Sequence, residues 1–246
     1  MALLEVHQIS HWFGGLQALR DVSLQADQEI LGLIGPNGAG KTTLFNIISG
    51  FLTPSKGEVI YQGKPIQKIP PYNIVRLGIA RTFQIVKPFT TLTVEENILA
   101  GLGMPYYPQM RGLISIYRTP ENLKIVSDLI EFCSLQNYRE ALANRLPIGI
   151  QRRLEIARAL ATKPKLLLLD EPAAGLVAQE AMELADLINK LFEKGIQIIL
   201  IEHNMRFAMN LCHRIVVLAQ GEIIAQGTPI EIQANDKVIN AYLGQE

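Results

Sequence analysis

The amino-acid sequence predicts an α/β protein in which a block of helices interrupts a mainly parallel sheet. Continuous apolar runs, typical of buried parallel strands, occur towards both ends of the chain, at 30–34, 166–169, 196–201 and 215–218. Between the first run and the others, residues 93–160 carry apolar residues at helical spacing and few strand signals. A chain of 246 residues is long enough to bury the core that such an arrangement requires.

Shorter β elements flank the first apolar run. Residues 3–9 and 20–26 alternate apolar and polar side chains, as half-buried antiparallel strands do. Residues 57–69 are expected to form a hairpin that turns at Gln62-Gly63. These segments predict a small antiparallel sheet beside the parallel one.

A complete phosphate-binding motif follows the run 30–34. The residues Gly35-Pro36-Asn37-Gly38-Ala39-Gly40-Lys41-Thr42 fit GxxxxGK[ST], and a helix is expected at Thr43–Ile48. Glycines let successive backbone N–H groups point at a phosphate, and the helix start adds a favourable dipole. Lys41 is then placed to reach the β- and γ-phosphates and the Thr42 hydroxyl to ligate Mg²⁺. The motif predicts a nucleotide site that comprises all eight residues and Thr43.

An acidic pair, Asp170-Glu171, ends the apolar run Leu166–Leu169. Ligands of open α/β sheets collect at the carboxyl ends of strands. We expect Asp170 to hold Mg²⁺, and Glu171 to orient and polarise the water that attacks the γ-phosphate. An acidic pair that only caps a helix is the alternative, and the glycine loop upstream makes it the weaker one.

With these two motifs, the chain resembles the ATP-binding cassette (ABC) transporter ATPases over essentially its whole length. The resemblance implies one domain over 1–246 with a P-loop NTPase fold. Its nucleotide-binding core and antiparallel β subdomain would comprise 1–85 and 161–246, and a helical subdomain would be inserted at 86–160.

Three further motifs of that family have counterparts here. The glutamine loop matches Gln84, which would contact Mg²⁺ and the attacking water. The switch histidine matches His203, which would hydrogen-bond the γ-phosphate. The aromatic loop that stacks on adenine matches Trp12-Phe13-Gly14-Gly15, where we expect Phe13 to stack, with Trp12 or a plain core role for either as alternatives.

Two motifs depart from the family pattern. The signature LSGGQ, which binds the γ-phosphate of the ATP held by the opposite subunit, aligns with Leu146-Pro147-Ile148-Gly149-Ile150. Pro147 and Ile150 remove the serine and glutamine side chains, whereas Gly149 still permits close approach of an anion to a helix expected at Gly149–Ala161. That helix could alternatively be only core. In the D-loop, Val177 replaces the usual Asp or Asn.

Finer features resemble the ATPase subunits of branched-chain amino acid importers: FGGLQAL, GIARTFQ, EPAAGL, IEHNM and AYLG, with a long irregular excursion at 103–120. The resemblance implies a motor subunit that hydrolyses ATP with Mg²⁺ on the cytoplasmic face of the cell membrane. Its partners would be a second ATPase, in a homodimer or heterodimer, two membrane permeases and, indirectly, an extracytoplasmic solute-binding protein. Related importers of urea or short amides share these sequence features and are one alternative. The other alternative is a regulatory cassette with poor turnover.

Composition excludes some classes. Lys and Arg together number 23, as do Asp and Glu, so no basic excess favours nucleic acid. The longest uncharged stretches, 42–55 and 97–110, fall short of the roughly 18 apolar residues of a membrane span. Soluble ABC proteins of DNA repair or translation usually carry two cassettes or a long coiled coil, and this chain shows neither. Cys133 and Cys212 are expected to be reduced core thiols.

Overall fold

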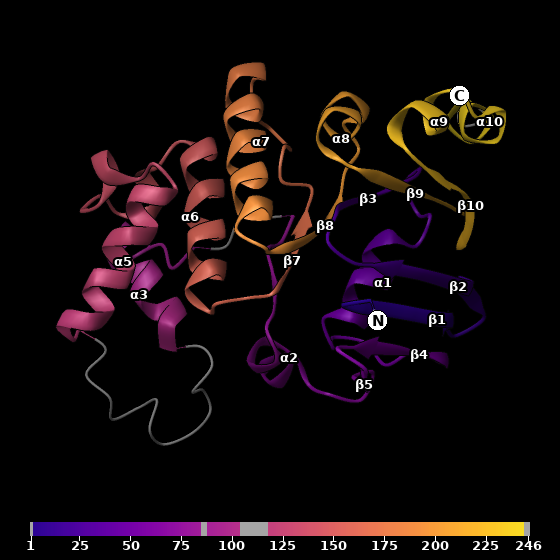
Figure 1. The fold of residues 1–246 in the computed structure, drawn as a ribbon, viewed down its shortest axis with the longest axis horizontal. Coiled ribbons are helices and arrows are strands. Elements are labelled where there is room, and N and C mark those ends of the chain that lie inside the picture. The colour runs from indigo at the N-terminus through magenta and orange to yellow at the C-terminus, as the bar shows by residue number, and fades with distance from the viewer. Residues whose placement is uncertain (1, 85–87, 104–117, 244–246) are drawn as a thin grey trace.

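The computed structural model describes residues 2–84, 88–103 and 118–243. Within them, the chain forms two sheets and a group of helices at one end (Figure 1). The antiparallel sheet has the order β2-β1-β4-β5, and these strands are β1 Leu4–Phe13, β2 Leu16–Ala26, β4 Lys56–Tyr61 and β5 Lys64–Pro65. The larger sheet has the order β10-β9-β3-β8-β7-β6: β10 Glu222–Gly227, β9 Arg214–Ala219, β3 Ile30–Ile34, β8 Gln197–Ile201, β7 Leu166–Asp170 and β6 Ile79–Arg81.

The larger sheet is parallel from β9 to β6, and only β10 runs antiparallel to its neighbour. Every residue of β3, β7 and β8 is buried, as the continuous apolar runs predict for strands covered on both faces. Because neighbouring strands are parallel, the carboxyl ends of β3, β8, β7 and β6 meet at one edge of the sheet. That edge collects the predicted site residues.

Helix α1, Lys41–Ile48, lies between the two sheets (Figure 1). Its apolar residues Leu44, Phe45 and Ile48 share one buried cluster with Leu4 and Val59 of the antiparallel sheet and with residues of β3 and β7. The helix begins two residues earlier than the sequence predicts. Its first turn therefore contains Lys41, Thr42 and Thr43.

The predicted hairpin at 57–69 is confirmed as β4 and β5. Gln62 and Gly63 at its turn both have positive φ, 49° and 73°, as a two-residue hairpin turn requires. The strands β1 and β2 are longer than the alternation at 3–9 and 20–26 predicts, and register shifts interrupt β1 where the alternation lapses. The sequence analysis does not anticipate the short helix α2, Pro71–Leu77, the three-residue strand β6, or β10.

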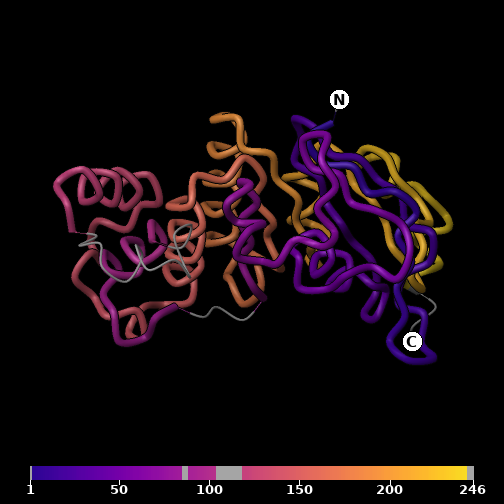
Figure 2. Tube along the Cα trace, turned by 90° about the horizontal axis from the view of Figure 1, so that it is seen from below, coloured from indigo at the N-terminus to yellow at the C-terminus, as the bar shows by residue number. Residues whose placement is uncertain are grey.

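The predicted helical segment contains α3 Val94–Gly103, α5 Pro120–Phe132 and α6 Ile148–Ala161, which group together at one end of an elongated molecule (Figure 2). The expected helix at Gly149–Ala161 is confirmed as α6. One buried cluster runs from Val94 and Ile98 of α3 through Leu154 of α6 to Leu167 of β7. The subdivision at residues 85/86 and 160/161 stays a prediction, and most of the excursion expected at 103–120 lies outside the described residues.

Four further helices follow β7 in the chain: α7 Ala178–Glu193, α8 Met205–Leu211, α9 Pro229–Gln233 and α10 Asp236–Leu243. Helix α7 lies beside α6, and α9 and α10 lie at the end of the molecule that holds the C-terminus (Figure 1). Among the described residues, no helix combines the length and apolar character needed to cross a membrane. Cys133 and Cys212 are buried and free, which confirms the expectation of core thiols.

Candidate nucleotide-binding and hydrolytic site

The loop between β3 and α1 requires glycine at two positions. Gly35 and Gly40 have φ values of 148° and 102°. A Cβ on Gly35 would lie 1.9 Å from the Leu218 carbonyl oxygen, and one on Gly40 would lie 2.6 Å from that of Ala18. The backbone of β2 and β9 thus presses on the loop from outside, and only glycine allows the close packing.

Lys41 lies in the first turn of α1 and folds back over the loop. Its Nζ donates to the carbonyl oxygens of Gly35 at 2.6 Å and Pro36 at 2.8 Å. Burial lowers the pKa of Lys41, and the charges of Glu171 and Asp170 oppose that shift. The ammonium group is therefore bound to the loop and lies within electrostatic range of the two carboxylates expected to surround a phosphate and its metal.

The start of α1 presents donors beside this lysine. The first intrahelical bond joins the Leu44 N–H to the Gly40 carbonyl at 2.9 Å. The N–H groups of Lys41, Thr42 and Thr43 precede it and belong to the helix start, where anions are favoured. The Thr42 side chain is exposed and that of Thr43 half-buried. These features suit a phosphate-binding loop.

Glu171 connects two other predicted site residues. Its Oε1 lies 2.7 Å from Nε2 of His203, and its Oε2 accepts a hydrogen bond from Nε2 of Gln84 at 2.8 Å. Its backbone has a positive φ of 48°, uncommon for a residue other than glycine, and its N–H donates to the Ile201 carbonyl at 3.0 Å. The three residues predicted to be catalytic therefore converge, although they follow three different strands, β6, β7 and β8.

Asp170 is buried and has a partner that the sequence analysis does not anticipate. Its Oδ2 accepts from Nη2 of Arg81 at 2.8 Å, and both side chains are buried. Arg81 also donates to Asn46 at 2.7 Å and Ser49 at 2.9 Å, both on or beside α1. A charged residue at the end of the apolar strand Ile79–Arg81 was the only local signal for this role. Arg81 fixes the orientation of Asp170 and takes one of its two carboxylate oxygens.

Glu202 binds the backbone of the segment that carries His203, a role that the sequence analysis does not anticipate. Its carboxylate is buried and accepts from the Ala173 N–H at 2.9 Å, and from the N–H groups of His203 and Asn204 at 3.2 Å each. Burial raises its pKa, and these three backbone donors oppose the shift. The segments that carry Glu171 and His203 are therefore joined through Glu202.

The residues present fit a magnesium ion bound together with a nucleotide. The described residues contain no group of three or more His, Cys, Asp or Glu that would form a complete protein cage. Mg²⁺ instead takes one or two protein oxygens and completes its shell with phosphates and water. Asp170, Thr42 and Gln84, the predicted ligands, supply a carboxylate, a hydroxyl and an amide at one edge of the sheet.

The two aromatic candidates end β1. Phe13 is 48% exposed and makes an edge contact with His11, with the ring centroids 4.7 Å apart. Trp12 is half-buried, and Nζ of Lys56 lies 5.6 Å from its ring centroid. The greater exposure of Phe13 favours it for stacking on a base, and this assignment stays a prediction.

The start of α6 differs from a free anion site. Pro147 is the N-cap residue, and Pro147 and Ile148 are exposed. Gly149 is buried, and a Cβ on it would lie 2.8 Å from Oε1 of Glu180 in α7. The other oxygen of Glu180 accepts from the Val177 N–H at 3.1 Å. A carboxylate thus lies beside the one signature glycine that the sequence retains.

Comparisons with known proteins agree with this geometry. The family model described as ABC transporter matches residues 19–174, more than half of the chain. The chain belongs to the ABC transporter family. It is an ATP-binding cassette, and a second model, described as branched-chain amino acid ATP-binding cassette transporter, matches residues 222–246. The recognition of the family and of the P-loop NTPase fold from sequence is thereby confirmed.

Individual relatives extend over the whole cassette. The high-affinity branched-chain amino acid transport ATP-binding protein BraF of Pseudomonas aeruginosa is 40% identical over 99% of this chain and 98% of its own length. LivG of Escherichia coli, of the same description, is 42% identical over the same shares. The crystal structure of the ADP conformation of the ABC transporter cassette MJ1267 superimposes with a TM-score of 0.91 at 33% identity, covering 100% of both chains. The cassette is accordingly a nucleotide-binding ATPase of a transport system.

Proposed function

We propose that the cassette is the ATP-hydrolysing motor of an importer for branched-chain amino acids, bound peripherally to the cytoplasmic face of the membrane. The observation that carries the motor role is the placement of Glu171 between Gln84 and His203. The charge of Glu171 also acts on Lys41. The solute class is supported by the similarity to BraF and LivG, both branched-chain amino acid transport ATP-binding proteins, and by the match at residues 222–246.

This proposal assigns a role to each residue of the site. The loop Gly35–Thr42 and Thr43 bind the phosphates of ATP, and Phe13 stacks on the base. Glu171 orients the attacking water, Gln84 contacts that water and the metal, and His203 donates to the γ-phosphate. Asp170, Thr42 and Gln84 hold Mg²⁺, which when bound neutralises charge on the transferred phosphoryl group.

We further propose that the working unit is a heterodimer with a second ATPase, bound to two permeases and served by an extracytoplasmic binding protein. The eroded start of α6, with Pro147, Ile150 and the neighbouring Glu180, supports a partner that has an intact signature. The site built from Lys41, Glu171 and His203 would then use the partner's signature and be the stronger one.

The substitution Glu171→Gln tests the motor role. Gln keeps the shape of the side chain but removes the charge that polarises water, so hydrolysis should fall on the order of 10³-fold. Equilibrium binding of ATP should stay within a few-fold, and the dimer should accumulate in a closed, ATP-bound form. Normal turnover by this variant would refute the role of Glu171.

The solute class requires a transport assay. With permeases and binding protein in proteoliposomes, leucine, isoleucine or valine should stimulate ATP hydrolysis, and urea or acetamide should not. Stimulation by the amides alone would replace the amino acid assignment without affecting the motor role.

A regulatory cassette that binds ATP and turns it over poorly is the second candidate. The carboxylate of Glu180 beside Gly149 and the exposed Val177 favour it. ATP hydrolysis by the chain alone, with the second ATPase and with the permeases separates the two, because a regulatory cassette should contribute little turnover in any of the three.

A further inference from the structure

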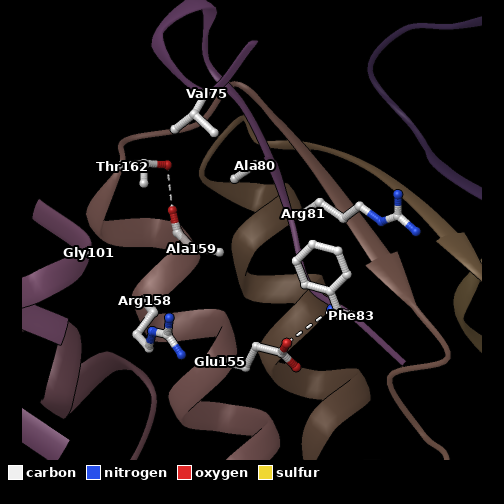
Figure 3. A pocket seen from close by; sticks show the side chains of 9 residues that line it. All are labelled: Val75, Ala80, Arg81, Phe83, Gly101, Glu155, Arg158, Ala159 and Thr162. Atoms are coloured by element: carbon white, nitrogen blue, oxygen red, sulfur yellow. Dashed lines mark hydrogen bonds between the residues drawn. The ribbon is translucent and has the colours of Figure 1, made fainter. Parts of the chain in front are cut away.

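Helix α6 binds the backbone of Phe83 and Gln84 through two charged side chains. Glu155 Oε1 accepts from the Phe83 N–H at 3.0 Å (Figure 3). Arg152 donates from Nη1 to the Phe83 carbonyl at 3.1 Å and from Nη2 to the Gln84 carbonyl at 2.8 Å. Two side chains three residues apart on one helix thus bind three backbone groups of a two-residue segment.

These bonds begin where the sheet bonds of β6 end. The N–H of Thr82 still donates to the Leu168 carbonyl of β7 at 2.9 Å. Phe83 and Gln84 lie beyond this bond, and Arg152 and Glu155 of α6 bind their backbone groups instead. The location of Gln84, and therefore of its side chain, depends on α6 as well as on the sheet.

Both charged side chains are buried at this contact. Arg152 is 5% exposed and Glu155 is 9% exposed. Their closest charged atoms are 3.8 Å apart, longer than the bonds each makes to the backbone. Burying a charge costs free energy unless the charge is paired or hydrogen-bonded. If this contact only filled space, apolar side chains would fill it at a lower cost in free energy.

We propose that Arg152 and Glu155 are positioning residues that hold the Gln84 amide against Glu171. The proposal rests on the role proposed above for Gln84 beside the hydrolytic carboxylate. It adds a mechanical link, because Gly149 lies one turn before Arg152 on the same helix. A displacement of the start of α6, where the neighbour's ATP is expected, would carry Gln84 with it.

A matched pair of variants separates positioning from mere stabilisation. Glu155→Gln keeps an oxygen acceptor for the Phe83 N–H, whereas Glu155→Met has similar length and none. Arg153→Met is the control, because Arg153 is the next residue on α6 and its ion pair is with Glu183 of α7. The measurements are kcat and KM for ATP in the assembled transporter, and hydrogen exchange of the Phe83 amide in the purified chain.

We expect Glu155→Met to lower kcat about tenfold, the effect of losing one hydrogen bond to a charged group. Its KM for ATP should stay within twofold, because the P-loop residues are untouched, and the Phe83 amide should exchange at least tenfold faster. Glu155→Gln should retain most of kcat, and the Phe83 amide should exchange as slowly as in the unsubstituted chain. Arg153→Met should match the unsubstituted chain in both measurements.

Equal kcat for Glu155→Met and Glu155→Gln, or unchanged Phe83 exchange in Glu155→Met, would overturn the proposal. Should Glu155→Met fail to fold, Arg152→Lys and Arg152→Met provide the same comparison, since lysine keeps one donor and methionine none. Equal kcat for those two would also overturn it. If Gln84→Ala retains full kcat, the role proposed for Gln84 fails, while Phe83 exchange still reports whether α6 holds the segment.

Discussion

Two regions of the cassette are proposed to bind phosphate, and they are built differently. At the carboxyl edge of the sheet, Lys41, Asp170 and Glu171 are buried or half-buried and each has defined partners. At the start of α6, Pro147 caps the helix without a side-chain hydrogen bond, Ile148 is 41% exposed, and the retained glycine packs against an acidic side chain. The first region brings together the side chains proposed to bind and hydrolyse ATP, whereas at the second Pro147 and Ile150 offer no polar side chain and the carboxylate of Glu180 lies beside Gly149.

This difference indicates that the cassette is equipped for its own nucleotide better than for that of a neighbour. A helix start favours anions through its free N–H groups, and a carboxylate beside it reduces that effect. The two regions are nevertheless connected, because α6 carries both Gly149 and the side chains that bind the Gln84 backbone. The following experiments test whether the contrast holds.

Removing the charge of Lys41 should disable the first region almost completely. Lys41→Ala deletes the ammonium group that binds the Gly35 and Pro36 carbonyls, and we expect ATP hydrolysis to fall on the order of 10³-fold. Lys165→Ala, which removes an exposed lysine just before β7, is the matched control and should have no effect. Hydrolysis by Lys41→Ala within tenfold of the control would mean that the loop does not bind the phosphates as described.

Breaking the buried ion pair tests how firmly the first region is held. Arg81→Met leaves Asp170 buried and unpaired, so the free energy of unfolding should fall by about 3 kcal/mol or more. Arg20→Met breaks the exposed pair with Glu222 and should cost less than about 1 kcal/mol. Denaturant titration of both variants measures the difference, and equal losses would show that the Arg81 pair contributes no more than a surface contact.

The helix that joins the two regions should make stability depend on pH. Burial raises the pKa of Glu155 from 4.5 to about 7, although the Phe83 amide, Arg152 and Arg158 favour the charged form; Asp170 adds to the rise. A raised carboxyl pKa gives stability that is fully present below pH 4.5 and lost as the pH passes 7. The loss is of the order of 3 kcal/mol.

Comparison with Glu155→Gln isolates this effect, because the other titrating groups are shared. Between pH 5 and pH 8, the unfolding free energy of the unsubstituted chain should fall relative to that of the variant. A difference between the two proteins that does not change with pH would place the Glu155 pKa near its ordinary value.

Restoring polar side chains at the start of α6 should reduce the difference between the two regions. Of the substitutions described here, these should have the smallest effect. We expect Pro147→Ser with Ile150→Gln to increase ATP-driven dimer closure or hydrolysis up to about tenfold, as two regained hydrogen bonds allow. Adding Glu180→Gln should increase it further, since it removes the charge beside Gly149. Ile239→Gln, at an exposed isoleucine of α10, is the control. No change in closure or hydrolysis would remove the proposed asymmetry.

The sequence predicts the parts of the site whose determinants are local. The P-loop lies between one strand and one helix, and Glu171 follows directly after its strand, so spacing alone locates them. The hairpin at Gln62-Gly63 was predicted from its turn, yet Gln220-Gly221 has the same dipeptide, with φ values of 49° and 81°, and precedes the missed strand β10. That strand could have been found from the same signal.

The supporting side chains could not be predicted, because their partners are remote in sequence. Arg81 binds Asp170 at a separation of 89 residues, and Arg152 binds the Gln84 carbonyl at a separation of 68. Periodicity and motif spacing carry no information about such pairs. Burial of a charged residue, visible only in the fold, is what reveals Arg152, Glu155 and Glu202.

The most direct test of the asymmetry uses the dimer with the second ATPase. Glu171→Gln in this chain and the equivalent glutamate-to-glutamine change in the second ATPase are introduced one at a time, and ATP hydrolysis is measured in the assembled transporter. Our account predicts that Glu171→Gln removes most of the hydrolysis, because it disables the site paired with an intact signature, and that the change in the partner costs much less. Equal losses, or a larger loss from the partner's change, would contradict it.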